Sequence, residues 1–252
     1  MTDLLQVKHL NKCYPGFDLQ DLSITVKPGR IMGLIGKNGA GKSTTLKSIL
    51  NIVRPESGAV TMFGKNFLQN EKECKQKIGV VFGGIDFYPL KKLSAITSVT
   101  RRFYPDWEQE KYKAYLCQFS LDESKQFRML SNGMKVKYLL ALALSHNAQL
   151  YFLDEPTSGL DPVSRDEILH IFTRIVKDGK RSILFSAHIT SDLDRCADDI
   201  TYIQNGRVLK SADKKTFLQS FAHLKNAEDS GPLTLEEIML RTEGRDLDES
   251  AL

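Results

Sequence analysis

A glycine-rich segment at residues 36–43 carries the residue types that hold a polyphosphate. It reads Gly-Lys-Asn-Gly-Ala-Gly-Lys-Ser, after an apolar run at 31–35 typical of a buried strand and before a segment with helical spacing at 44–50. Glycines let backbone N–H groups approach phosphate oxygens, and a helix N-terminus adds partial positive charge. We expect Lys42 to reach the β- and γ-phosphates and the Ser43 hydroxyl to ligate Mg²⁺. The segment predicts an ATP site that includes Gly36, Asn38, Gly39, Ala40, Gly41, Lys42, Ser43 and Thr44.

Two carboxylates, Asp154 and Glu155, end a second apolar run at 150–153. The carboxyl edge of a parallel sheet is where ligands bind, so these acids are expected to face the phosphates. Asp154 would hold Mg²⁺ directly or through water, and Glu155 would orient and deprotonate the attacking water. An acidic pair that simply ends a strand is the structural alternative, and the phosphate loop in the same chain argues against it.

Two further segments could contact an anion, and each has a structural alternative. His188 follows an apolar run at 182–185 and could donate to the γ-phosphate, although a lone histidine is more often structural. Ser131 is a good N-cap for a helix that begins with Asn132 and Gly133. Its hydroxyl and the Gly133 N–H could form a second anion site, or the segment could be merely a capped helix.

Composition and charge narrow the classes of protein. The 252 residues are 41% hydrophobic and 26% charged, with a net charge of +4 and no long basic block, so no nucleic-acid partner is expected. The apolar run at 138–144 is much shorter than the ~20 residues that span a bilayer, and the N-terminus has no secretory pattern. The four cysteines lie far apart without metal-ligand spacing, which predicts buried free thiols in a reducing compartment.

Alternating strand and helix patterns predict an α/β fold: a P-loop NTPase core of mixed sheet with flanking helices, an N-terminal antiparallel β subdomain and a helical insertion. In the insertion, at about 86–135, an apolar stripe predicts a helix that packs on its own subdomain or binds a partner. The sequence Asn205-Gly206 predicts a hairpin. Strands are predicted at 5–10, 19–26, 31–35, 59–63, 78–82, 150–153, 182–185, 200–204 and 207–210, and helices at 44–50, 134–146, 164–176 and 192–197.

The domain boundary is placed near residue 210. Residues 1–210 would form the ATPase domain and 211–252 a short C-terminal tail. A capping box at Thr234–Glu237 predicts one helix in the tail, and the last residues are expected to be disordered.

These segments, in this order and with the Ser-Gly-Leu-Asp sequence at 158–161, resemble the ATP-binding cassette (ABC) ATPases over roughly residues 4–210. In that family two cassettes pack head to tail, and each ATP lies between one phosphate loop and the other subunit's signature serine. The resemblance implies that Ser131 and Gly133 contact ATP bound by the partner's Lys42 and that Asp161 signals across the interface. It further implies that Glu155 is the catalytic base, that His188 senses the γ-phosphate and that Tyr14 stacks on adenine.

The chain departs from the family pattern in two places. The usual signature Leu-Ser-Gly-Gly-Gln has Asn132 and Met134 in place of its first glycine and its glutamine. Gly83 stands where the family has a glutamine that ligates Mg²⁺ and links the nucleotide to the membrane domain. The second departure removes the residue that in the family ligates Mg²⁺ and couples the nucleotide to the membrane domain, and water could fill the vacant position in the Mg²⁺ shell.

The resemblance extends to the ATPase subunits of bacterial ABC-2-type exporters. It implies a Mg²⁺-dependent ATPase, homodimeric or paired with a different cassette, that drives a separate membrane permease from the cytoplasmic face. Two alternatives stay open: a soluble ABC ATPase that acts on ribosomes or DNA, and a regulatory nucleotide-binding subunit with little turnover.

Overall fold

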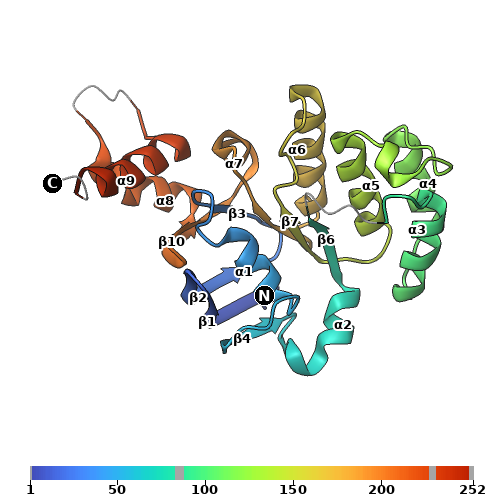
Figure 1. Cartoon of the computed structure of the whole chain (residues 1–252), viewed down its shortest axis with the longest axis horizontal. Coiled ribbons are helices and arrows are strands. Elements are labelled where there is room, and N and C mark those ends of the chain that lie inside the picture. The colour runs from blue at the N-terminus through green and yellow to red at the C-terminus, as the bar shows by residue number, and fades with distance from the viewer. Residues whose placement is uncertain (1, 83–87, 227–230, 250–252) are drawn as a thin grey trace.

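The computed structural model describes residues 2–82, 88–226 and 231–249, with side chains up to residue 244. The N-terminal part forms an antiparallel four-stranded sheet in the order β2-β1-β4-β5 (Figure 1). Its strands are β1 (Leu5–Tyr14), β2 (Phe17–Val26), β4 (Ser57–Met62) and β5 (Lys65–Asn66). The predicted antiparallel subdomain is confirmed.

A second sheet has six strands in the order β10-β9-β3-β8-β7-β6. It is parallel except for β10, which pairs antiparallel with β9, so the predicted mixed sheet is confirmed. Asn205 and Gly206 join β9 to β10 with positive φ angles of 46° and 74°, as the Asn-Gly hairpin signal predicts. The strands are β3 (Ile31–Ile35), β6 (Ile78–Phe82), β7 (Leu150–Asp154), β8 (Ser182–Ser186), β9 (Asp199–Gln204) and β10 (Arg207–Asp213).

Alternation along the central strands divides the apolar residues between two cores. Because successive side chains point to opposite faces of a strand, Phe152 and Leu184 join the core shared with the antiparallel sheet. Their neighbours Leu153 and Phe185 join the core on the other face, where the Phe172 ring packs on Phe185 at a centroid distance of 5.5 Å. Burial on both faces explains why these strands read as continuous apolar runs.

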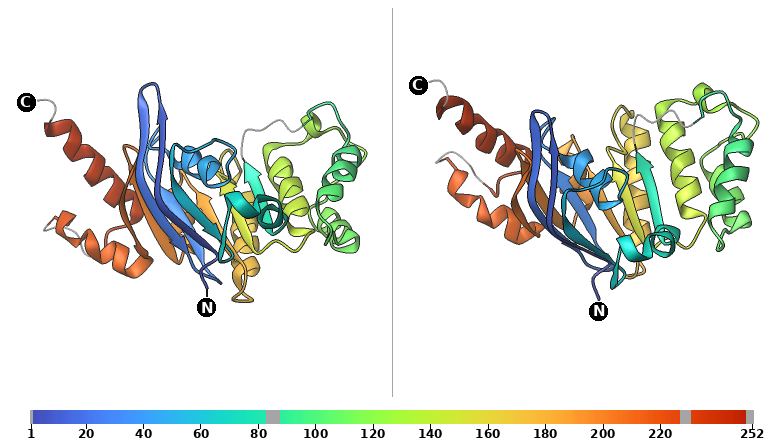
Figure 2. Two further views of the ribbon diagram at one scale, coloured as in Figure 1. Left: turned by 90° about the horizontal axis from the view of Figure 1, so that it is seen from below. Right: turned by 60° about the horizontal axis from the view of Figure 1, so that its bottom comes forward.

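Helices cover both faces of the mixed sheet, and further helices lie beyond it at both ends (Figure 2). The helical insertion lies at one end and the C-terminal helices at the other. In the insertion, Tyr112, Leu116 and Phe119 are buried, so the predicted stripe packs on its own subdomain. The α-helices are α1 (Lys42–Ile49), α2 (Glu71–Gln76), α3 (Leu93–Thr100), α4 (Gln109–Gln118), α5 (Asn132–Leu144), α6 (Pro162–Val176), α7 (Thr190–Cys196), α8 (Lys214–Ser220) and α9 (Leu235–Glu249).

The C-terminal tail carries two α-helices, α8 and α9, where the sequence predicts one. The capping box before α9 is present: the Glu237 carboxylate accepts from the Thr234 N–H at 2.7 Å, and the Thr234 hydroxyl accepts from the Glu237 N–H at 3.2 Å. Helix α8 has a single cap, from the Asp213 carboxylate to the Thr216 N–H, and lacks the reciprocal pair that identified α9. The predicted disorder of the last residues lies outside the described part of the chain.

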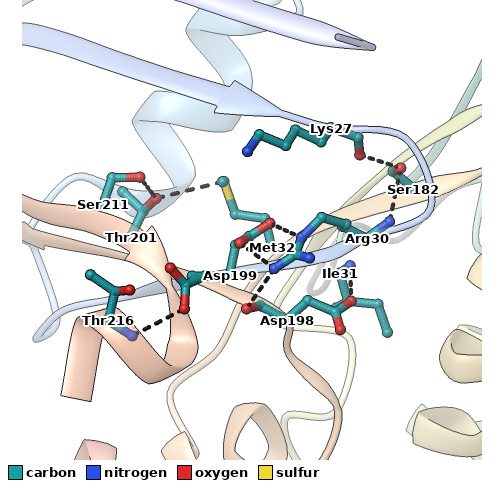
Figure 3. A network of polar contacts seen from close by, with 11 residues as sticks. Lys27, Arg30, Ile31, Met32, Ser182, Asp198, Asp199, Thr201, Ser211 and Thr216 are labelled. Atoms are coloured by element: carbon teal, nitrogen blue, oxygen red, sulfur yellow. Dashed lines mark hydrogen bonds and ion pairs between the residues drawn. The ribbon is translucent and has the colours of Figure 1, made fainter. Parts of the chain in front are cut away.

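A polar network fixes the start of β3, the strand that leads into the phosphate loop (Figure 3). The Arg30 guanidinium donates twice to the Asp199 carboxylate, at 2.6 and 2.7 Å. The Ile31 N–H donates to the Asp198 carboxylate at 2.8 Å, and the Ser182 hydroxyl donates to the Lys27 carbonyl. These bonds join the start of β3, and the turn before it, to the starts of β8 and β9, at the sheet edge opposite to the one from which the phosphate loop departs.

All four cysteines are free, and the expectation that they are buried is wrong for two of them. Cys13 and Cys117 are exposed, whereas Cys74 is buried and Cys196 is partly buried. Cys117 follows the buried Leu116 on α4, and a step of about 100° per residue turns it away from the packed face. Among the helices of the described residues, none has the length and apolar character to cross a membrane.

Candidate nucleotide site

The phosphate loop joins β3 to α1 in the predicted place, although the helix begins at Lys42, two residues earlier than expected. Two loop positions require glycine. A Cβ on Gly36 would lie 2.2 Å from the Ile203 carbonyl oxygen. At Gly41, φ is +110° and a Cβ would lie 2.7 Å from the Phe17 ring. The loop is therefore held tightly against β9 and β2, with its N–H groups at the N-terminus of α1.

Lys42 is 4% exposed, and its ammonium donates to the carbonyls of Gly36 and Lys37 at 2.7 and 3.1 Å. Burial lowers the pKa of Lys42, and the charges of Glu155 and Asp154 oppose that shift. Carbonyls of the loop thus accept hydrogen bonds from the buried ammonium, whose burial without partners would be strongly unfavourable. Phosphate oxygens placed here would provide stronger, charge-assisted partners.

Ser43 and Asp154 meet at the end of β7, as the sequence predicts. The Ser43 hydroxyl donates to Asp154 Oδ1 at 3.0 Å, and the Ser186 hydroxyl donates to the same oxygen at 2.6 Å. A hydroxyl and a carboxylate this close form part of an oxygen ligand set that suits Mg²⁺. Among the described residues, no group of three His, Cys, Asp or Glu side chains is placed to hold a metal ion.

Glu155 and His188 form an ion pair beside Lys42 if the imidazole is protonated. Glu155 Oε1 lies 2.8 Å from His188 Nε2, and both side chains are about one-third exposed. The Glu155 backbone is left-handed, with φ +50°, and its N–H donates to Ser186. This unusual backbone turns the carboxylate away from the line of β7 and toward His188.

A cleft of about 560 Å³ contains most of the predicted residues. Tyr14 is absent from its walls, and the aromatic residue that lines the cleft is Phe17, which is not among the predicted residues. Tyr14 is 39% exposed and pairs with Phe17 across the β1–β2 hairpin. The sequence signal that could have identified Phe17 is its position: it is an aromatic residue that directly follows a Pro-Gly turn and precedes the phosphate loop. The residues lining the cleft are Gly16, Phe17, Asn38, Gly39, Gly41, Lys42, Ser43, Thr44, Glu155 and His188.

Gly36 and Ala40 belong to the phosphate loop and Asp154 contacts Ser43, although none of the three lines the cleft. Ser131, Gly133 and Asp161 form a second group, away from the cleft walls. The Ser131 hydroxyl caps α5 by accepting from the Met134 N–H at 3.2 Å. A Cβ on Gly133 would lie 3.4 Å from the Ser164 hydroxyl, so the start of α5 adjoins the start of α6. There the Asp161 carboxylate caps α6, and bonds from Ser164 lower its pKa. The predicted residue Gly83 lies outside the described part of the chain.

A larger cavity, of about 780 Å³, lies between β10, α8 and the segment before α9. It contains none of the predicted site residues. Two charged side chains that line this cavity already have partners within the protein. Arg30 pairs with Asp199, and the Lys214 ammonium donates to the Leu193 carbonyl. We assign the chemistry to the smaller cleft, because the loop, the acids and the histidine converge there.

Comparison with known proteins supports this assignment. The family model described as "ABC transporter" matches residues 19–158. The chain is 31% identical over 228 residues to the bacitracin transport ATP-binding protein BcrA of Bacillus licheniformis, covering 89% of this chain and 72% of that protein. It is 30% identical to the Nod factor export ATP-binding protein I of Cupriavidus metallidurans, covering 87% and 74%. A solved structure described as "Structure of ATP binding subunit of ABC transporter" gives a TM-score of 0.83 at 27% identity, covering 95% of this chain and 99% of that one.

Proposed function

The chain belongs to the ABC transporter family of ATP-binding subunits, and from this we propose that it hydrolyses Mg²⁺-ATP to drive export through a separate membrane permease. ATP binding and hydrolysis are general properties of the family. The observation that carries the specific proposal is the convergence of Lys42, Ser43, Asp154, Glu155 and His188 on one end of the mixed sheet. These groups come from three different strand ends, so the fold itself assembles them.

Each group has a role that follows from its position. The loop N–H groups and Lys42 bind the phosphates, while Ser43 and Asp154 supply oxygens for Mg²⁺, which would neutralise charge on the phosphates. Glu155 orients and deprotonates the attacking water. His188 donates a hydrogen bond to the γ-phosphate and stabilises its developing charge. Tyr14 or Phe17 stacks on the base.

Ser131, Gly133 and Asp161 support a head-to-tail pairing with a second cassette. They lie together at the starts of α5 and α6 and are not among the residues that line the cleft of their own chain. Their N–H groups and helix dipoles would complete the partner's anion site. The second cassette is either another copy of this chain or a different ATPase, and the pair would sit at the inner face of the membrane on the permease.

Phosphate release by the purified chain tests the enzymatic part of the proposal. We expect hydrolysis of ATP that stops when EDTA removes Mg²⁺ and resumes when Mg²⁺ is restored. Binding of ATP without measurable release would favour the regulatory alternative. Affinity purification from solubilised membranes tests the partner: co-purification of an integral membrane protein supports export, whereas enrichment of ribosomes contradicts it.

A further inference from the structure

The C-terminal helix α9 sends a carboxylate to the phosphate loop. Glu243 Oε2 lies 3.0 Å from the Lys37 ammonium, and Glu243 Oε1 accepts a hydrogen bond from the Tyr202 hydroxyl at 3.0 Å. The Glu243 side chain is 16% exposed and that of Lys37 is 52% exposed. Two oxygens of one nearly buried carboxylate therefore contact two segments beside the nucleotide cleft.

Lys37 is the second residue of the loop, and its backbone organises the loop's turn. Its carbonyl oxygen accepts from the Ala40 N–H at 3.1 Å and from the Lys42 ammonium at 3.1 Å. A displacement of Lys37 would thus move the turn and one anchor of Lys42 together. The ion pair with Glu243 acts on the side chain of this same residue.

Tyr202 places the second contact next to the loop. It lies on β9 directly opposite Ile35 in the parallel β3–β9 pair, and Ile35 is the residue that precedes Gly36. Tyr202 is fully buried, so its hydroxyl holds the Glu243 carboxylate from a rigid position. Glu243 is therefore aimed at Lys37 by the strand next to the loop.

Helix α9 is anchored without help from this ion pair. Leu235 and Ile238 are fully buried in the main core, the capping box fixes the first turn, and the Arg241 guanidinium donates to the Leu224 carbonyl at 2.9 Å. Glu243 lies beyond these anchors, on the part of the helix that reaches the loop. Removing its charge should leave α9 in place.

We propose that Glu243 is a positioning residue for the phosphate loop: through Lys37 it holds the loop in the ATP-binding conformation. It thereby couples the docking of the C-terminal helix to ATP affinity. This inference depends on the proposed function, because the loop must bind ATP for the coupling to be measurable. Coupling is reciprocal, so bound ATP should also stabilise the docked helix.

The test is the dissociation constant of ATP for Glu243→Gln, Lys37→Met and the double variant, measured by calorimetry. Glutamine keeps an oxygen for the Tyr202 hydroxyl and removes only the charge. We expect each single variant to bind ATP about fivefold more weakly, with KM rising by the same factor and kcat much less affected. The double variant should be no weaker than either single one, since both remove one interaction.

Glu236→Gln is the matched control, because Glu236 is an exposed glutamate on the first turn of the same helix. A purely structural role for Glu243 would lower the melting temperature and leave ATP affinity unchanged. Lys37→Met alters a half-exposed loop side chain and provides the second measurement if Glu243→Gln fails to fold. Unchanged or tighter ATP binding in either single variant overturns the proposal, as do additive losses in the double variant. If wild type itself does not bind ATP, the proposed function fails as well; if it binds and the variants match it, only this inference fails.

Discussion

Nε2 of His188 lies 2.8 Å from Oε1 of Glu155, although 33 positions separate the two residues. The register of the parallel sheet brings them together: Asp154 at the end of β7 pairs with Ser186 at the end of β8. The residues that follow β7 and β8 therefore leave the sheet at the same edge. The Glu155 N–H donates to both the Ser186 carbonyl and its hydroxyl, at 3.2 and 3.0 Å, which fixes the first residue after β7.

Glu155→Gln should lower kcat by about 10²–10⁴-fold while ATP still binds. Glutamine has the same size and keeps the backbone bonds to Ser186, but it cannot take a proton from water. Single-turnover phosphate release and calorimetry measure the two effects, and size-exclusion chromatography with ATP should show an accumulated dimer. Glu110→Gln is the control, because Glu110 lies on α4 with its side chain 86% exposed. Wild-type turnover in Glu155→Gln would contradict the assignment of the base.

Lys42→Ala should weaken ATP binding by at least about thirtyfold, because removing one partner of a desolvated charge pair typically costs 2–5 kcal/mol. The loss should appear in the dissociation constant and not only in kcat, since Lys42 contacts the phosphates in the bound state. Lys47→Ala provides the comparison: it removes the same charge from the last turn of α1, away from the loop. Equal ATP affinity in wild type and Lys42→Ala would remove the basis for the phosphate site.

Local sequence signals were sufficient to predict the part of the site that is formed by one continuous segment of the chain. The strand, loop and helix at 31–49 are contiguous, so glycine spacing and apolar patterning predicted both the fold and the residues. The acids at 154–155 and His188 could be placed because parallel strands end at one edge. The Ser43–Asp154 contact follows from the same rule, applied to two segments 111 residues apart.

Contacts that depend on tertiary packing could not be predicted in this way. Nothing near Lys37 in the sequence points to Glu243, which lies 206 positions away on a helix placed by its own buried residues. Phe17 and Tyr14 are both aromatic, flank the same turn and lie directly opposite each other, so the local sequence does not indicate that Phe17 lines the cleft and Tyr14 does not. Cys117 shows the same limit, since its exposure depends on which face of α4 is packed.

The two aromatic residues at the β1–β2 hairpin give competing predictions for the adenine contact. The family resemblance favours Tyr14, and the cleft lining favours Phe17. Base stacking on an aromatic ring is worth about 1–3 kcal/mol, so alanine at the stacking position should weaken ATP binding by about 5- to 150-fold. We expect the larger loss for Phe17→Ala, with Phe17→Tyr close to wild type. A larger loss for Tyr14→Ala would restore the choice made from the sequence.

Stability should fall in mild acid because of His146, which is 2% exposed and stacks on Tyr104 with ring centroids 3.8 Å apart. Burial lowers the pKa of His146 to about 4, from 6.5. The neutral form is therefore favoured in the native state, and the full stability is present above pH 6.5. As the pH falls below 6.5 the unfolded chain gains the proton first, so stability is lost progressively until the pH reaches about 4.

When the pH falls from 7 to 5, the titration of His146 should lower the free energy of unfolding by about 2 kcal/mol. His146→Gln tests the attribution, because its amide N–H can still donate to the Gln76 backbone and it does not titrate. Urea denaturation measures the free energy of unfolding at the two pH values. Its decrease from pH 7 to pH 5 should be smaller for His146→Gln than for wild type by about this amount. His223→Gln is the matched control, since His223 is exposed on the short helix after α8 and should retain the wild-type pH dependence. Equal losses in wild type and His146→Gln would mean that other groups carry the acid sensitivity.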